Sequence, residues 1–205
     1  MTNQIEQGSD EWKQLRLGKV TASRIADVMS QIKAGESQSR SNYRIELVCE
    51  RLSGEPTDGF TNSHMQRGTE LEPFARSAYE IKNKVFVEQV SFCDHLTVSM
   101  SGASPDGLVG KDGLIEIKCP MTKTHIETLL GKQVPAKYIK QIQWQLACTD
   151  RKWCDFVSYC PELPENMQLF ISRVERDDEV IDGITKAVIE FNLEVEQVIE
   201  RLKGL

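Results

Sequence analysis

The residues best suited to chemistry lie within one stretch, "SGASPDGLVGKDGLIEIKCP", at positions 101–120. It holds two acids and one lysine of interest, Asp106, Glu116 and Lys118, among small and apolar neighbours. Side chains alternate between the faces of a strand, so Glu116 and Lys118 share one face and the isoleucines beside Glu116 share the other. Such a strand is either half-exposed with an ordinary salt bridge, or it carries a metal site that hydrolyses phosphodiesters.

The position of Asp106 depends on the turn between the two strands. We expect a three-residue turn over positions 111–113, with its glycine in the left-handed conformation. Gly110 then pairs with Leu114. The same count sets Asp106 opposite Lys118, and opposite residues share a face with Cβ atoms about 5 Å apart. A two-residue turn would place Asp106 on the other face, so the three-residue turn is the one that gathers the three charges.

Two carboxylates this close repel each other, and apolar surroundings raise their pKa values unless a cation lies between them. Magnesium, a hard divalent ion that binds carboxylate oxygens, can be that cation. A lysine beside it suits a group that orients or deprotonates an attacking water, or that neutralises charge on a phosphoryl transition state. The Glu-x-Lys pattern alone more often indicates a salt bridge, but the Ser-Pro-Asp-Gly turn before it favours the metal site.

The stretch "SPDGLVG…GLIEIKCP" closely resembles the lambda exonuclease (YqaJ-like) family of phage recombination exonucleases, within the PD-(D/E)XK nuclease superfamily. Three further stretches resemble the same family. "EWKQLRLGKVTASRI" is similar to its N-terminal segment, "RGTELEPFARSAYE" to a helix with a further acid, and "YIKQIQWQL" to a helix with a glutamine. The combination, in this order over positions 10–150, is far more specific than any one motif.

The resemblance implies a metal-binding and catalytic set. Its members are Asp106 and Glu116 as metal-binding catalytic acids, Lys118 as the catalytic lysine, Glu72 as an acid of the metal site or its surroundings, the Ile117 carbonyl as a metal ligand, and Gln141 as a group that holds the active-site water or the lysine. From its own pattern, Gln141 fits a solvent-facing helix position equally well. The implied cofactor is Mg²⁺, as two ions, with Mn²⁺ as a substitute.

The resemblance also implies a site for a terminal 5′-phosphate, formed by Arg16 with the hydroxyls of Ser23 and Ser104. Free backbone N–H groups and a hydroxyl at a helix N-terminus attract anions, and arginine adds bidentate phosphate contacts. The alternative for Arg16 is a surface arginine at a helix end. Met65 lies where the family has an apolar wedge that parts the duplex end, although its pattern is also typical of a core methionine.

The 205 residues predict one domain, positions 1–205, because no stretch has the composition of a linker. Helices are expected at 9–16, after "VTAS" at 20–23, and at 41–54, 63–84, 134–149 and 177–205; strands are expected at 84–93, 96–104, 152–160 and 168–176 beside the hairpin. The apolar stripe of the last helix comprises Ile181, Ile184, Val188, Phe191, Val195, Val198 and Leu202. The fold class is α/β (α+β), with a central mixed sheet flanked by helices. The resemblance makes it a restriction-endonuclease-like core.

A net charge of −6 argues against a general nucleic-acid coat protein, but it allows an enzyme with local basic regions. No apolar run approaches the ~20 residues that span a bilayer, and the N-terminus lacks signal-peptide features. We therefore expect a protein of the bacterial host cytosol without membrane contact. The six cysteines and three histidines have no metal-like or framework spacing, so we expect reduced, mostly buried thiols and no zinc site.

The function that the resemblance implies is magnesium-dependent 5′-to-3′ digestion of linear double-stranded DNA. It would release 5′-mononucleotides and leave 3′ overhangs for phage-type recombination, as a homotrimeric ring that works with a single-strand annealing protein. One alternative is another nuclease of the superfamily, an endonuclease or a resolvase. The other is an inactive DNA-binding protein, which the presence of all four charged residues of the implied site disfavours.

Overall fold

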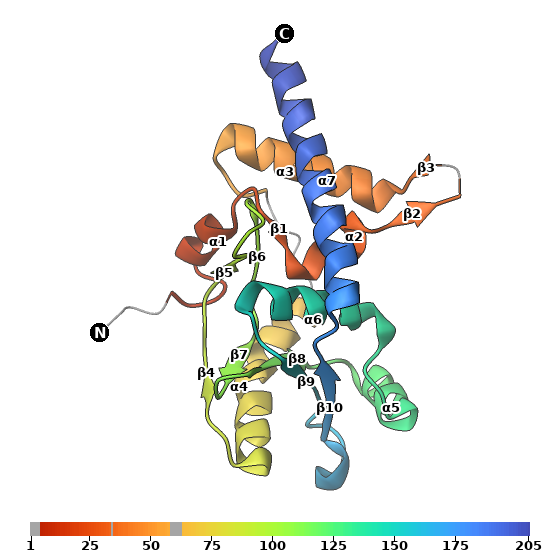
Figure 1. The fold of residues 1–205 in the computed structure, drawn as a ribbon. Coiled ribbons are helices and arrows are strands. Elements are labelled where there is room, and N and C mark those ends of the chain that lie inside the picture. Colours follow the sequence, from red (N-terminus) through yellow and green to blue (C-terminus); the bar gives the residue numbers. More distant parts are fainter. Residues whose placement is uncertain (1–4, 34, 58–62) are drawn as a thin grey trace.

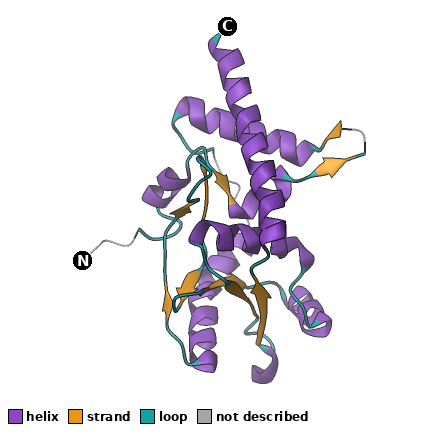
Figure 2. Cartoon of the chain, viewed as in Figure 1, coloured by secondary structure: helices purple, strands orange, loops and turns teal. Residues whose placement is uncertain are grey.

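The computed structural model describes residues 5–33, 35–57 and 63–205, and Figures 1 and 2 show helices packed on and above a small sheet. The α-helices are α1 (Asp10–Arg16), α2 (Ile25–Val28), α3 (Gln38–Ser53), α4 (Ser63–Asn83), α5 (Thr122–Gly131), α6 (Ala136–Thr149) and α7 (Asp178–Lys203), with 3₁₀ turns η1 (Ala22–Arg24) and η2 (Glu165–Met167). The strands are β1 (Val20–Thr21), β2 (Gln31–Ile32), β3 (Gly35–Glu36), β4 (Val87–Glu88), β5 (Cys93–Asp94), β6 (Ser101–Ala103), β7 (Gly107–Val109), β8 (Gly113–Lys118), β9 (Trp153–Tyr159) and β10 (Leu169–Glu175).

The central sheet has the order β10-β9-β8-β7-β4, so the strand with Glu116 and Lys118 lies in the middle. β8 runs parallel to β9, whereas β7 and β8 are antiparallel, as are β4 with β7 and β9 with β10. A second sheet, β1-β6-β5, joins the N-terminal segment to the strand that precedes the hairpin. The predicted mixed α/β fold is confirmed.

Helices cover both faces of the central sheet. On one face, Ile115 and Ile117 of β8 pack with Ala75 and Tyr79 of α4. On the other face, Leu114 packs in a cluster with Ile142 and further residues of α6 and β9. Because β8 is enclosed on both faces, its residues other than Lys118 are all buried. The site strand is therefore fixed by packing along its length.

The long C-terminal helix α7 crosses α3 and α6 above the sheet, and its N-cap Asp177 accepts hydrogen bonds from the first backbone N–H groups. Its predicted stripe is largely confirmed: from Ile181 to Val195 the stripe residues are buried. The last turn differs. Ile199 is buried, while the predicted Leu202 is 44% exposed. The helix extends beyond the body of the protein at this end, so Leu202 meets no core.

The expected strands at 84–93 and 96–104 are shorter than predicted, as β4, β5 and β6. The side chain of His95 explains part of the difference, because its Nδ1 accepts hydrogen bonds from the backbone N–H groups of Thr97 and Val98. This local turn and the left-handed Met100 (φ 53°) interrupt the extended backbone. Helix α5 and the β2–β3 pair were not predicted from the sequence.

The hairpin turn lies one residue earlier than expected. The observed pairs include Val109 with Gly113 and Gly107 with Ile115, and Gly110 is the left-handed residue (φ 55°). The predicted pairing is therefore wrong by two positions, and Asp106 lies beside Glu116. A shift of two keeps every side chain on its face, so the three charges still gather.

Gly113 is needed in the strand for a different reason, which is the close approach of Trp153 from β9. A methyl group at Gly113 would lie 2.1 Å from atoms of the indole ring. Arg151 also fixes the turn, because its Nη1 donates to the carbonyls of Gly110 at 2.9 Å and Gly113 at 2.7 Å. Tertiary contacts therefore decide which of the two glycines is left-handed.

Gly113→Ala is expected to lower the free energy of unfolding by about 1–3 kcal/mol, because the indole ring must move to admit the methyl group. Gly183→Ala is the matched control, since a methyl group there would meet nothing within 4 Å in α7. Replacing a helical glycine should instead raise stability by about 0.5–1 kcal/mol. Urea denaturation followed by circular dichroism measures both, and a Gly113→Ala protein as stable as the native one would contradict this packing.

Within the described ranges, no helix combines the length and apolar character needed to cross a bilayer. The six cysteines are unpaired; Cys119, Cys148, Cys154 and Cys160 are buried, and Cys49 is exposed. This agrees with the expectation of mostly buried thiols.

Candidate active site

Asp106 lies half-buried immediately before β7, next to the middle strand of the sheet. Its Oδ2 accepts a hydrogen bond from the backbone N–H of Ile117 at 2.6 Å. Burial raises the pKa of Asp106 well above its ordinary value, and the negative charge of Glu116 raises it further. The charge of Lys118 opposes this shift. Asp106 and Glu116 therefore repel each other, as two carboxylates with no cation between them should.

Glu116 is 1% exposed, and three donors hold its carboxylate. Gln141 Nε2 donates to Oε1 at 2.6 Å, and Lys118 Nζ lies 2.5 Å from the same oxygen. Gln145 Nε2 donates to the other oxygen, Oε2, at 2.6 Å. A buried carboxylate is tolerated when its oxygens accept several charge-assisted hydrogen bonds, so the position of Glu116 is well determined.

Lys118 is partly open to solvent, since its side chain is 31% exposed. Burial lowers the pKa of Lys118, but the charges of Glu116 and Asp106 outweigh burial and raise it above its ordinary value. The ring centroid of Tyr138 on α6 lies 5.5 Å from Nζ, which adds a cation–π contact. The ammonium group thus stands at the edge of the site with its charge retained.

Glu72 projects from α4 toward this group. Burial raises the pKa of Glu72, the charge of Arg76 one turn later opposes the shift, and the charge of Glu116 adds to it. The Glu72 carboxylate contacts the Arg76 guanidinium directly. Glu72 therefore lies close enough to Glu116 for their charges to interact, but its carboxylate forms an ion pair with Arg76.

The donors at this site fit a hard divalent cation. Asp106, Glu116 and the Ile117 carbonyl offer only oxygen, the ligand type that Mg²⁺ and Mn²⁺ prefer. Burial and the charge of Glu116 raise the pKa of Asp106, and a cation between the two acids would oppose this shift. In the described part of the chain, no three His, Cys, Asp or Glu side chains converge as a metal site. These two acids and the carbonyl would hold the ion, with Glu72 nearby.

Gln141 was predicted from the sequence as a site residue, whereas Gln145 was not. The two lie four residues apart on α6, so they project from the same face of the helix toward Glu116. The spacing of the two glutamines was the available signal. Gln145 was overlooked because it lies in a run that reads as a buried helix face.

The implied phosphate site lies at α1. Arg16 is half-buried, its guanidinium stacks 3.9 Å from the ring centroid of Trp12, and it forms no ion pair with an acid of the described chain. Trp12 Nε1 donates to Ser104 Oγ at 3.0 Å, so one indole ring joins Arg16 to Ser104. Ser23 is exposed, and its Oγ lies 3.4 Å from Thr21 Oγ1. The indole thus connects two of the three predicted phosphate ligands, and Trp12 was missed as a site residue.

Comparison with known proteins places these residues in a family. The model of the YqaJ-like viral recombinase domain matches residues 11–152, which include every site residue named above. The chain belongs to the YqaJ-like viral recombinase domain family. The resemblance predicted from the sequence is confirmed.

Three solved structures similar to this YqaJ-like chain are exonucleases by name. The alkaline exonuclease LHK-Exo from Laribacter hongkongensis is 53% identical, with a TM-score of 0.90 over 96% of this chain and 97% of that one. A structure of LHK-Exo in complex with dAMP matches at 54% identity. A phage-related exonuclease from Haemophilus somnus 129PT, 16% identical with a TM-score of 0.72, shares the fold over 93% of this chain and 99% of that one.

A curated relative is the uncharacterized protein R354 of Acanthamoeba polyphaga mimivirus, 25% identical over 196 residues. The match covers 89% of this chain, which spans about a third (34%) of the length of that relative. The family of the chain therefore rests on the recombinase-domain match over residues 11–152, and its fold on the LHK-Exo structures at 53% and 54% identity.

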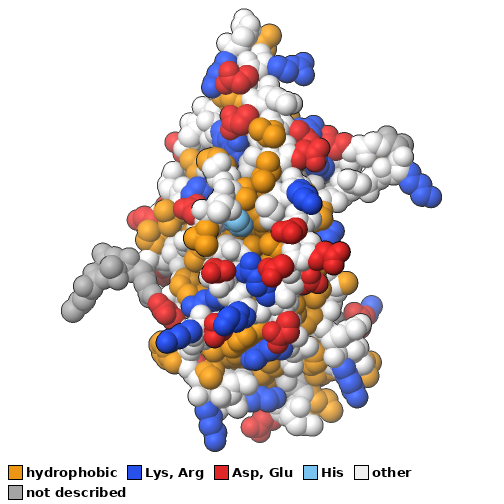
Figure 3. All heavy atoms as spheres, in the orientation of Figure 1, with side chains coloured by type: hydrophobic (Ala, Val, Ile, Leu, Met, Phe, Trp, Pro, Cys, Tyr) orange, Lys and Arg blue, Asp and Glu red, His pale blue; other side chains and the backbone are white. Residues whose placement is uncertain are grey.

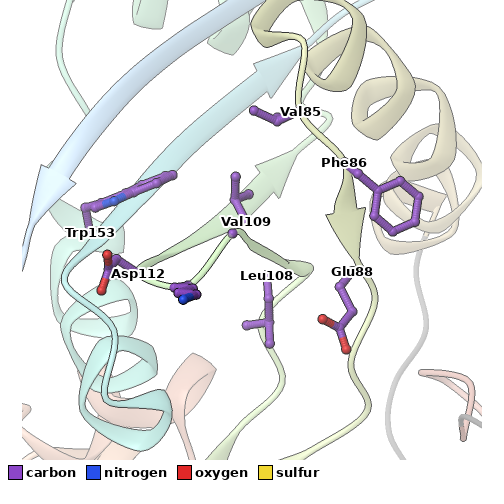
Figure 4. A pocket seen from close by; sticks show the side chains of 9 residues that line it. Val85, Phe86, Glu88, Leu108, Val109, Asp112 and Trp153 are labelled. Carbon is purple, nitrogen blue, oxygen red and sulfur yellow. The ribbon is translucent and has the colours of Figure 1, made fainter.

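Two further features of the YqaJ-like chain lie outside this charged group. Met65, near the start of α4, is 55% exposed, so a core role does not describe it, and its role as a wedge stays a prediction. A hollow of about 550 Å³ lies between β4 and the hairpin turn, lined by Phe86, Leu108, Trp153 and their neighbours (Figure 4). Neither Glu116 nor the other charged site residues line it, so this hollow is not the active site.

Proposed function

We propose that the protein is a magnesium-dependent 5′-to-3′ exonuclease of linear double-stranded DNA. The observation that carries the proposal is the contact of Lys118 with Glu116, beside Asp106, in a chain 53% identical to an alkaline exonuclease. We further propose that it releases 5′-mononucleotides and leaves 3′ overhangs for recombination in the bacterial cytosol. Support for the product comes from the solved complex of LHK-Exo with dAMP.

Each residue has a role in this proposal. A bound Mg²⁺ ion would supply a Lewis acid and an activated water, and Asp106, Glu116 and the Ile117 carbonyl would hold it. Lys118 stabilises the negative charge that develops on the phosphoryl oxygens, since its ammonium group is a partly exposed cation beside Glu116. Gln141 holds the Glu116 oxygen that Lys118 also contacts.

One assay separates this proposal from the alternatives. A 5′-labelled linear duplex and a closed circular duplex are incubated with the protein, with Mg²⁺ or with EDTA. An exonuclease releases labelled mononucleotide from the linear substrate only when Mg²⁺ is present, and it leaves the circle intact. Cleavage of the circle would indicate an endonuclease or a resolvase, and binding without cleavage would indicate an inactive DNA-binding protein.

Arg16→Ala is expected to slow digestion of 5′-phosphorylated ends by about 10-fold or more and to leave metal dependence unchanged. The guanidinium has no acidic partner in the described chain and is held by Trp12, so it is available for a phosphate. Lys13→Ala is the control, because Lys13 is a cation of the same helix that is paired with Asp10. If Arg16→Ala prefers 5′-phosphate to 5′-hydroxyl ends by the native margin, Arg16 is not the phosphate ligand.

We also propose that the protein assembles as a homotrimeric ring and works with a single-strand annealing protein. On the face drawn in Figure 3, acidic and basic side chains are interspersed. A chain of net charge −6 with such a surface suits DNA enclosed in a locally basic channel better than DNA on the outer surface. One pair of patches repeated by rotation closes such a ring.

The assembly has a direct test. Sedimentation equilibrium at micromolar concentration should give three times the chain mass of 23.3 kDa. A single chain mass at that concentration would refute the ring.

A further inference from the structure

Gln145 is a buried polar side chain at the active site. Its amide nitrogen has a hydrogen-bond partner, and its amide oxygen has none among the described residues. It is 1% exposed on α6, and its Nε2 donates to Glu116 Oε2 at 2.6 Å. Its Oε1 is buried and has no hydrogen-bond partner among the described residues. An amide oxygen buried in this way has lost its hydrogen bonds to water without replacing them, which destabilises the folded state. The fold retains a costly group at this position.

Packing does not explain Gln145. Its neighbours along α6 include Ile142 and Leu146, which are fully buried in the apolar cluster on this face of the sheet. A methionine or leucine would fill the same space without an unpaired oxygen. The carboxylate of Glu116 has only acceptor atoms, so it requires Nε2 toward it and turns Oε1 away. The contact with Glu116 is therefore what fixes the amide and leaves its oxygen unpaired.

Gln145 and Gln141 act on different oxygens of Glu116. Gln141 and Lys118 both contact Oε1, on the side that leads to solvent through Lys118. Gln145 contacts Oε2 from the interior of the helix face. With Oε2 held from inside, the carboxylate plane cannot rotate about its Cγ–Cδ bond without breaking a short hydrogen bond.

We propose that Gln145 is a positioning residue of the active site, which orients the Glu116 carboxylate so that the site binds a divalent cation. The inference rests on the proposed function, because it concerns the same site. Partners that orient a metal-binding carboxylate commonly change metal affinity or activity by 10–100-fold when removed. Gln145 is expected to act in this range through Glu116, without contact to DNA.

Gln143 provides a matched control on the same helix. It is 2% exposed, and both of its amide atoms are satisfied: Nε2 donates to the Glu175 carbonyl at 2.8 Å and Oε1 accepts from the Asp177 N–H at 2.9 Å. These bonds fasten α6 to the junction of β10 and α7. Loss of Gln143 should therefore affect stability and leave cation binding unchanged.

The test compares Gln145→Met with Gln143→Met, since methionine keeps the length and volume of glutamine without its polar atoms. Ca²⁺ binding without DNA is measured by isothermal titration calorimetry, and cleavage of a linear duplex is measured against Mg²⁺ concentration. Gln145→Met should weaken Ca²⁺ binding and raise the half-saturating Mg²⁺ concentration by about 10-fold or more, with KM for DNA ends unchanged. Gln143→Met should keep both values within about twofold and lower the midpoint of thermal unfolding.

The outcomes distinguish the inference from the function on which it rests. If the native protein binds Ca²⁺ and cleaves, and Gln145→Met has the same constants, the positioning role is overturned and the nuclease stands. If the native protein neither binds Ca²⁺ nor cleaves, the proposed function is overturned together with this inference. If Gln145→Met fails to fold, the Ca²⁺ affinity of Gln145→Asn is measured in its place. Asparagine keeps the amide but is one methylene too short to reach Oε2, so native Ca²⁺ affinity in that variant would overturn the role.

Discussion

Lys118→Ala is expected to reduce the cleavage rate by about 100-fold or more in a protein that remains folded. The side chain supplies a partly exposed cation at the site, and its Nζ contacts Glu116 Oε1 at 2.5 Å. The negative charge of a phosphoryl transition state would lose its nearest positive partner in the protein. Single-turnover cleavage of a linear duplex at saturating Mg²⁺ measures the effect without product release.

The control for Lys118→Ala is Lys152→Ala, which removes a lysine paired with Asp112 at the hairpin turn. It should cleave at the native rate, because the turn lies at the opposite end of β8 from Lys118. Thermal unfolding verifies that both variants are folded. Near-native cleavage by folded Lys118→Ala would remove this lysine from the mechanism.

Asp106→Asn is expected to abolish cleavage and, in EDTA, to unfold at a higher temperature than the native protein. Burial and the charge of Glu116 raise the pKa of Asp106, so its ionised form is less stable in the folded state than in the unfolded chain. Asparagine keeps an oxygen that accepts from Ile117 N–H but carries no charge. For a chain of this size, each kcal/mol relieved raises the midpoint by roughly 2–4 °C.

The sign of the pH dependence follows from the raised pKa of Asp106. Below about pH 4 the carboxyl is protonated in both states, and the variant and native proteins should be equally stable at this position. As pH rises, the unfolded state ionises first, so the native protein loses stability until the pH passes the folded-state pKa. The advantage of Asp106→Asn in EDTA should therefore appear above about pH 4 and level off at higher pH.

Added Mg²⁺ should reverse the order of stability. It stabilises the native protein by binding the folded state and has less effect on Asp106→Asn, which lacks a ligand. Asp112→Asn at the hairpin turn is the control, because Asp112 is 51% exposed and lies outside the site. Differential scanning fluorimetry in EDTA and in Mg²⁺ measures all three proteins. An Asp106→Asn protein less stable than the native one in EDTA would contradict the repulsion between Asp106 and Glu116.

Long elements with clear periodicity were predictable from the sequence. The helix expected at 63–84 is observed as α4, and the helix expected at 177–205 is observed as α7. Their apolar residues recur at helical spacing, so local pattern and tertiary packing agree. The short strands were not predictable, because side chains such as His95 cap the backbone locally and end the extended segments.

The identity of the charged residues at the site was predictable, but their register was not. Gly110 and Gly113 both tolerate a left-handed conformation, so the sequence of the hairpin does not choose between them. Trp153, forty positions later in the chain, packs on Gly113 and keeps it in the strand, so Gly110 is the left-handed residue. Asp106 lies on the predicted face although the predicted pairing was wrong by two positions, because side chains alternate with a period of two.

The residues that sequence reasoning missed at the site share a property. Trp12 and Gln145 contact the predicted residues, whereas the motif marks only those expected to touch metal or phosphate. Each is an ordinary residue in a helical pattern, and its role is visible only once α1 or α6 is placed in space. Supporting contacts of this kind depend on the tertiary structure more than on any local spacing.

The position of β8 in the middle of the sheet has a consequence for motion. A strand with hydrogen-bonded neighbours on both edges and helices on both faces cannot open by local fraying, so its amide hydrogens exchange with solvent only when the sheet as a whole opens. Gly113 to Ile115, which are paired on both edges, thus belong to the slowest-exchanging part of the protein, and Glu116 and Lys118 continue the same strand beside β9. The active-site strand is ordered during folding, and substrate binding need not supply the entropy of ordering it.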